Sequence, residues 1–148
     1  MSQNNPISPD QVELVQQTWR KVVPIAGTAA TLFYERLFSE NPELAPMFAG
    51  VDLPEQRNKL VKAINMVVMS LERIETLVPT IRDLGKRHAG YGVDDAHYAP
   101  VGAALLWTLE TGLGEAWSDE AAAAWSAAYG LLADTMMAGA AEAGLDAA

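Results

Sequence analysis

Apolar residues recur every three or four positions along most of the chain, and no stretch shows the strict alternation of a half-buried strand. The clearest stripe is Leu77, Ile81 and Leu84. Residues at this spacing lie on one face of an α-helix, where they can pack against a core. The sequence therefore predicts an all-α protein.

Capping signals and breakers divide the chain into helices. Ser8-Pro9-Asp10-Gln11 combines a capping box with proline at the first helical position. Asn41-Pro42-Glu43 and Ser118-Asp119-Glu120 are further start signals, and Gly90-Tyr91-Gly92 ends a helix. We expect helices over about 9–24, 27–39, 42–48, 54–71, 77–89, 95–113 and 119–138. They form a single domain over 1–148, with 1–7 and about 139–148 as frayed tails.

Composition narrows the classes of partner. The 148 residues fit one domain, and the absence of cysteine excludes disulfides, thiolate metal sites and thioether-attached cofactors. The formal net charge of −9 would repel phosphate backbones and anionic lipid, so we expect no nucleic-acid or membrane partner. We find no signal peptide and no apolar run long enough to cross a bilayer, which favours a cytoplasmic protein.

Three polar residues lie where a structural helix would prefer leucine. His88 extends the Leu84 stripe, Gln56 precedes Leu60 by one turn, and Tyr34 follows Phe33. Burying such a group without a partner costs about 1–3 kcal/mol. Each also has an ordinary interpretation: a satisfied core histidine, a first-turn glutamine, and a tyrosine whose hydroxyl reaches the surface.

Taken together, the three residues indicate a more specific chemistry. A neutral imidazole can ligate iron on one face of a haem. A phenol and an amide opposite it would donate hydrogen bonds to a bound diatomic gas, favouring dioxygen over carbon monoxide. The apolar stripes would hold the porphyrin without a covalent link.

Several motifs share the order and spacing of one protein family. The segment 84–93, LGKRHAGYGV, resembles the proximal segment of globins, and Pro42 and Phe48 fall where globins open the C helix and pack a phenylalanine on haem. Tyr34 and Gln56 match distal positions. Over about 8–137 the chain resembles globins, specifically single-domain bacterial haemoglobins related to flavohaemoglobins, with some similarity to neuroglobin.

The resemblance implies a three-over-three globin fold with one haem b (iron protoporphyrin IX). It makes His88 the iron ligand and places Tyr34 and Gln56 beside the gas. Further cofactor contacts would be Phe48, Leu60, Leu84, Arg87, Val93 and Tyr98. The implied function is reversible binding of dioxygen, nitric oxide or carbon monoxide, for oxygen storage, delivery or sensing. The alternative is a nitric oxide dioxygenase that forms nitrate with electrons from a separate reductase.

Two departures bear on that choice. Tyr98 matches the G-helix tyrosine of flavohaemoglobins, but Ala140 stands where they have an acid, and Glu142 is two residues away. We therefore expect weaker electron donation to the imidazole. The flavin and nicotinamide domains are also absent from the 148 residues, so electrons would come from another protein. A globin-fold regulatory module without haem is a third class, which His88 opposes.

Other polar residues allow weaker hypotheses. His97 with Asp94 and Asp95 could form a metal site, although the spacing fits no known ligand pattern, and a surface position at a helix start explains it equally. Lys86 and Arg87 could pair with haem propionates or simply stabilise a helix end. No paired carboxylates or Ser/His/Asp arrangement suggests a hydrolase.

Overall fold

The computed structural model describes residues 7–90 and 95–147, which are helical for most of their length and contain no strand. The α-helices are α1 (Pro9–Val22), α2 (Ala26–Glu40), α3 (Leu53–Met69), α4 (Val78–Gly90), α5 (Tyr98–Leu113) and α6 (Asp119–Ala147). Short 3-10 helices join them: η1 (Val23–Ile25), η2 (Pro42–Phe48), η3 (Leu71–Thr76), η4 (Asp95–His97) and η5 (Gly114–Ala116). The prediction of an all-α fold is confirmed.

The helix starts follow the local signals, with one exception. Ser8 Oγ accepts from the Gln11 backbone N–H at 3.1 Å, and Gln11 Oε1 accepts from Ser8 at 3.2 Å, so the predicted capping box is present. Ser118 Oγ likewise caps α6. Asn41 was expected to cap the next helix, but its amide donates back to Leu37 O at 3.2 Å instead. The segment after Asn41 is a 3-10 helix that its side chain does not cap.

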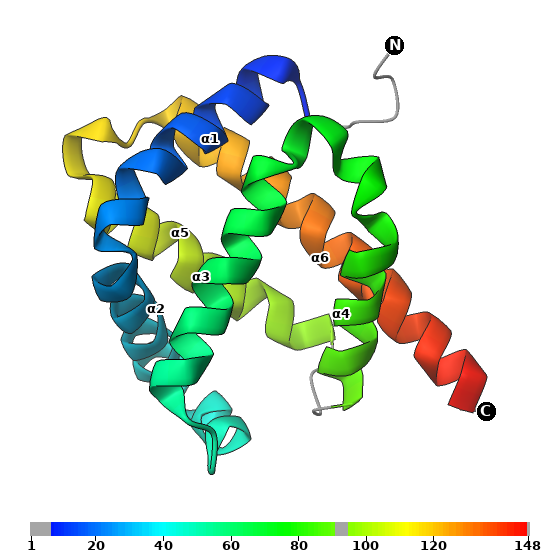
Figure 1. Ribbon diagram of the computed structural model, residues 1–148. Coiled ribbons are helices and arrows are strands. Elements are labelled where there is room, and N and C mark those ends of the chain that lie inside the picture. The colour runs from blue at the N-terminus through cyan, green and yellow to red at the C-terminus, as the bar shows by residue number, and fades with distance from the viewer. Residues whose placement is uncertain (1–6, 91–94, 148) are drawn as a thin grey trace.

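The six α-helices form two layers of three. α4 and α1 pack on α6, while α2 packs on α5 and α3. In Figure 1, α1, α3 and α4 run across α5 and α6. This is the predicted three-over-three sandwich of globins, in which ridges of one layer fill grooves of the other.

The core joins the layers through two tryptophans. The ring centroids of Trp19 on α1 and Trp125 on α6 lie 6.2 Å apart. Trp125 Nε1 donates to Thr18 Oγ1 at 2.8 Å, and Trp19 Nε1 donates to Asn65 Oδ1 on α3 at 2.9 Å. Because both indole N–H groups have acceptors, the rings can be buried without leaving an unsatisfied donor.

The frayed tails predicted at 1–7 and about 139–148 are longer than the structure supports. Ile7 is only 2% exposed and belongs to the core. The C-terminal segment does not fray at Gly139, because α6 continues to Ala147 and Gly139 is buried. A glycine- and alanine-rich composition suggested a frayed end, but the backbone at Gly139 packs directly on α4.

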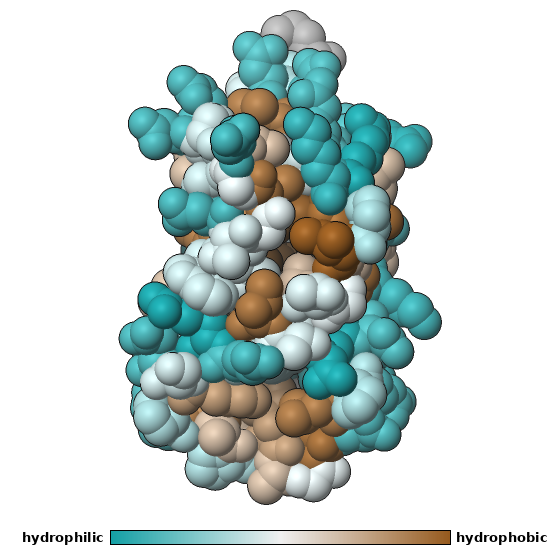
Figure 2. All heavy atoms as spheres, turned by 90° about the vertical axis from the view of Figure 1, so that its left-hand side faces the viewer, coloured by the Kyte–Doolittle hydropathy of each residue, from teal (hydrophilic) through white to brown (hydrophobic). Residues whose placement is uncertain are grey.

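The surface around the junction of α1 and α2 contains exposed apolar side chains. Val23 is 48% exposed and Ile25 39%. Figure 2 shows that hydrophobic atoms on this side of the molecule are interrupted by hydrophilic ones. Such mixed surfaces are ordinary in globular proteins and need no partner to explain them.

Candidate functional site

An aromatic cluster gathers side chains from α2 and η2. Phe33 and Tyr34 are consecutive on α2 and meet edge-on, with ring centroids 4.9 Å apart. Phe48 of η2 lies 5.7 Å from the Tyr34 ring and 5.2 Å from the Phe38 ring, again edge-on. Edge-to-face packing favours the quadrupoles of aromatic rings. The fold therefore brings Tyr34 and Phe48, two predicted site residues, into direct contact.

The phenol of Tyr34 is buried beside Gln56. Its side chain is in the core, with the residue 6% exposed, so the surface interpretation of Tyr34 is wrong. Burial raises the pKa of the phenol, while a hydrogen bond from Gln56 and the positive charge of Arg57 act in the opposite direction. The Gln56 amide therefore lies close to the phenol oxygen. Because burial raises its pKa, the phenol stays protonated at neutral pH.

Gln56 comes to this position because α3 begins at Leu53. The Asp52 carboxylate accepts from the Glu55 backbone N–H at 3.2 Å and fixes the helix start. Gln56 is thus a first-turn residue, as the ordinary interpretation had it, and it also reaches Tyr34. Leu60, one turn later, packs on the aromatic cluster.

His88 lies in the last turn of α4 and is half-buried. Its Nδ1 is 2.7 Å from the carbonyl oxygen of Leu84. A carbonyl can only accept, so Nδ1 bears the proton and the lone pair of the neutral ring is on Nε2. Metal-bound histidines usually hold this tautomer through the same kind of bond. The contribution of the Leu84 carbonyl was not anticipated, although a spacing of four residues on a helix could have indicated it.

The other predicted cofactor contacts lie in different parts of the structure. Leu84 and Tyr98 pack against the larger core rather than the aromatic cluster. Arg87 is exposed, and Val93 lies outside the described residues. Val101 and Leu105 of α5 join the aromatic cluster and were not predicted. Figure 1 shows the C-terminal end of α4 and the N-terminal part of α3 on two sides of the start of α5.

A tyrosine on α6 anchors the start of α5. Tyr129 Oη donates to the Tyr98 carbonyl at 2.6 Å. Gly102 permits this packing, since a Cβ there would be 2.7 Å from the Tyr129 ring. Burial raises the pKa of Tyr129, which keeps the hydroxyl a donor. Ala140, further along α6, places a methyl group where the resemblance led us to look for an acid.

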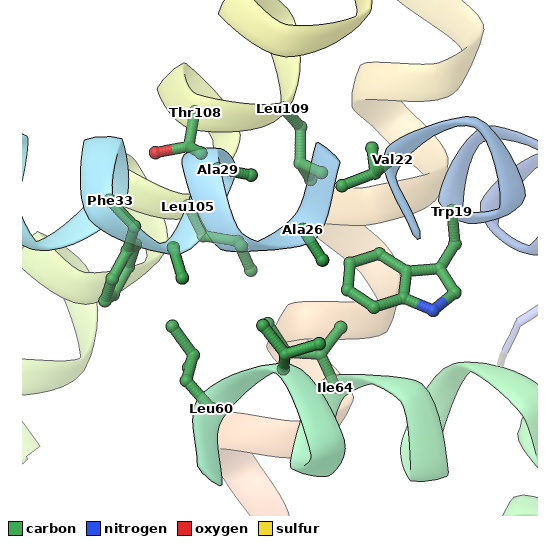
Figure 3. A pocket seen from close by; sticks show the side chains of 12 residues that line it. Trp19, Val22, Ala26, Ala29, Phe33, Leu60, Ile64, Leu105, Thr108 and Leu109 are labelled. Carbon is green, nitrogen blue, oxygen red and sulfur yellow. The ribbon is translucent and has the colours of Figure 1, made fainter. Parts of the chain in front are cut away.

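A small apolar cavity adjoins the aromatic cluster. Its volume is about 20 Å³, enough for one water-sized molecule. Thr108, its one polar lining residue, donates its hydroxyl to Ala104 O at 2.8 Å. The lining side chains come from α1, α2, α3 and α5 (Figure 3), and Phe33, Leu60 and Leu105 belong both to the cavity and to the cluster. The small side chains of three alanines on α2 make room for the cavity: Ala26, Ala29 and Ala30.

Two broader alternatives find no support within the described ranges. No group of three or more His, Asp or Glu side chains among residues 7–90 and 95–147 could hold a metal ion, and Asp94 of the His97 hypothesis lies outside those ranges. In the same part of the chain, no helix combines the length and apolar character needed to cross a membrane.

Comparison with known proteins identifies the protein family to which the chain is similar. The family model for globins matches residues 31–136. Flavohemoproteins are similar at modest identity: 37% over 106 residues in Rhizobium meliloti, covering 70% of this chain, and 31% over 133 residues in Bacillus anthracis, covering 88%. These matches cover 26% and 33% of the two relatives, so the chain spans about a third of their length or less.

Solved structures agree on the fold. A hexacoordinated heme protein from an anhydrobiotic tardigrade superposes with a TM-score of 0.84 at 13% identity, covering 93% of this chain and 97% of that one. A bacterial globin from Campylobacter jejuni superposes with a TM-score of 0.79 at 24% identity, covering 91% and 97%.

Proposed function

Because the chain belongs to the globin family, we propose that it holds one haem b and reversibly binds dioxygen or another diatomic gas, for storage, delivery or sensing. The observation on which this proposal chiefly depends is the buried Tyr34 phenol, which lies beside Phe48 and the half-buried Gln56 side chain. In this proposal His88 is the iron ligand, and Tyr34 and Gln56 face the gas.

The chemistry of His88 fits that role. The bond from Nδ1 to Leu84 O fixes the tautomer and the ring orientation, and it puts the lone pair of the ring on Nε2. When bound, haem would supply an iron that can take a nitrogen ligand and a gas. The imidazole remains neutral while it donates its lone pair.

Tyr34 and Gln56 would act as a unit. The Gln56 amide would donate to the phenol oxygen and so orient the ring, and the Tyr34 proton would then point to the gas. Of the two gases, dioxygen would offer the phenol a partly negative oxygen atom as acceptor, whereas carbon monoxide would offer little charge. A neutral donor in an apolar environment therefore favours dioxygen and slows its release.

The other proposed contacts are less directly supported. Phe48 and Leu60 pack in the same cluster as Tyr34, which suits walls of a pocket. Arg87 is exposed and could pair with a propionate at the edge. The residues that complete the proposed set are Leu84, Val93 and Tyr98.

Absorption spectra of the reduced, oxygenated and carbonylated protein test the proposal. We expect a Soret band that shifts with each gas. The His88→Ala variant should lose haem or change its reduced spectrum, while His97→Ala, which removes the other histidine, should behave as the original protein. A protein that stays colourless after haem addition, or a His88→Ala variant with unchanged spectra, would contradict it.

The similarity to flavohemoproteins favours a second candidate, a nitric oxide dioxygenase. The reaction balances as NO + O2 + e⁻ → NO3⁻, and its electron would come from a flavin-containing reductase. Loss of nitric oxide over many turnovers in the presence of NADH and such a reductase would support the enzyme. A single stoichiometric reaction would support the gas-binding protein.

A further inference from the structure

α4 and α6 touch backbone to backbone at two glycines. A Cβ added to Gly85 of α4 would overlap the carbonyl oxygen of Met136, and one added to Gly139 of α6 would overlap the carbonyl oxygen of Arg82. On each helix the carbonyl comes from the residue three positions before the glycine. The two contacts are therefore reciprocal. We call these four residues the glycine contact.

At the glycine contact the neighbouring atoms are backbone, whereas at Gly102 and Gly112 of α5 they are side-chain atoms. Gly27 on α2 and Gly130 on α6 have open space where a Cβ would be. A glycine inside a helix lowers its stability relative to alanine, because the chain loses more conformational freedom on folding. At Gly85 and Gly139 that loss is offset by a close approach of the two backbones, which Cα–H···O contacts can stabilise.

The glycine contact is one turn from His88. Gly85 precedes His88 by three residues and directly follows Leu84, whose carbonyl accepts from His88 Nδ1. The same helical turn thus contains the backbone that rests on α6 and the acceptor that orients the imidazole. A displacement of this turn would move the imidazole and its acceptor together.

We propose that Gly85 and Gly139 are positioning residues for His88, whose contact with α6 sets the direction in which the Nε2 lone pair points. This inference rests on the proposed role of His88 as the iron ligand. The partner atoms are backbone carbonyls, so no change of rotamer can make room for a methyl group. A C–H···O contact has a usual C···O distance of about 3.3–3.6 Å, and an alanine would force the helices apart by roughly 1.5 Å to reach it.

The test compares three alanine variants of the haem-loaded protein: Gly85→Ala, Gly139→Ala and the matched control Gly130→Ala. Resonance Raman spectra of the ferrous protein report the iron–histidine stretching frequency. We expect both contact variants to shift this frequency and to lose haem about tenfold faster to an excess of a haem-scavenging protein, the low end of effects from outer partners of a metal-bound histidine. Gly130→Ala should change neither.

A second background separates positioning from general damage to the fold. In a His88→Gly variant supplied with imidazole, the iron ligand is no longer attached to α4. Adding Gly85→Ala or Gly139→Ala to that background should leave the iron–imidazole frequency unchanged. Should Gly85→Ala fail to fold, Gly139→Ala alone tests the same contact from the other helix.

The outcomes distinguish the inference from the proposed function. If the iron–histidine band depends on His88 but stays unshifted in the folded contact variants, the glycine contact does not position His88. A frequency that shifts equally in the imidazole background would also overturn the inference. If the band survives in His88→Gly without imidazole, the proposed function itself fails, and the inference with it.

Discussion

The two regions around the proposed haem site are held together by different parts of the chain. Around Tyr34 the contacts are between side chains: three aromatic neighbours and the Gln56 amide. Around His88 the contacts are with backbone: the Leu84 carbonyl, and one turn away the glycine contact with α6. A side-chain environment can be adjusted by single substitutions, whereas a backbone contact tolerates almost none. We therefore expect gas binding to be tunable near Tyr34 and iron coordination to be fixed near His88.

The largest expected effect is on stability at the glycine contact. Gly85→Ala should lower the free energy of unfolding by about 3 kcal/mol, since a methyl group is forced against a carbonyl that cannot move aside. Gly130→Ala should raise it by about 0.5–1 kcal/mol, because alanine favours a helix. Urea unfolding of the two variants measures both. Equal effects at the two positions would show that the contact has no special tightness.

A double-mutant cycle sharpens this prediction. Once one alanine has separated the helices, the second should cost less, so Gly85→Ala with Gly139→Ala should destabilise by less than the two single variants added together. Gly85→Ala with Gly130→Ala should be additive. Additive costs at the contact would mean that the two glycines do not act on the same helix separation.

The next largest effect is on gas release near Tyr34. Tyr34→Phe keeps the ring and removes the donor, which should speed dioxygen release about 30-fold for the loss of about 2 kcal/mol of hydrogen bonding to a partly charged acceptor. Stopped-flow displacement by carbon monoxide measures the rate. The iron–histidine frequency should stay unchanged, and an unaltered release rate would contradict the role of the phenol.

Alkaline pH should also act on the tyrosines. Burial raises the folded-state pKa of Tyr34 and Tyr129 above the ordinary value near 10. Stability from each is fully present below that value and falls as the pH rises toward the folded-state pKa, by at most about 1.4 kcal/mol per pH unit for each tyrosine. Denaturant unfolding at several pH values above 10 should show a shallower loss in Tyr129→Phe. If stability fell equally steeply with pH in Tyr129→Phe and in the original protein, the buried Tyr129 phenol would not be the cause of the loss.

The smallest effect is expected at Gln56. Gln56→Leu removes the amide that lowers the Tyr34 pKa, so this pKa should rise further and the phenol should lose its proposed hydrogen-bond partner. Dioxygen release should become about fivefold faster, for about 1 kcal/mol. The stability of α3 should change little, since the Asp52 cap is unaffected. Release faster than in Tyr34→Phe would mean that Gln56 contacts the gas itself.

Local chemistry made part of this structure predictable. The Ser8 and Ser118 caps depend on neighbouring residues, so the sequence identified both helix starts. The helical period placed Tyr34 and Gln56 on inward faces, and the fold brings the two side chains together. The Leu84 bond to His88 is equally local and could have been predicted from a spacing of four residues.

Contacts between distant segments could not be predicted in this way. Gly139 lies in a run of small residues that resembles a frayed end, and only the arrival of Arg82 from α4 makes it a buried contact. Val101 and Leu105 look like ordinary apolar positions of α5 until Phe48 and Leu60 meet them. Asn41 shows the limit even for local signals, because its side-chain N–H donates to Leu37 O and its side-chain oxygen does not accept from the next helix.

The central claim is that His88 is the iron ligand, and the chain contains only two histidines. Resonance Raman spectroscopy of the ferrous haem-loaded protein, with and without nitrogen-15 in its histidines, tests this claim most directly. The account predicts an iron–histidine band that shifts with the isotope, persists in His97→Ala and disappears in His88→Ala. A band that persists in His88→Ala, or that does not respond to the isotope, would contradict it.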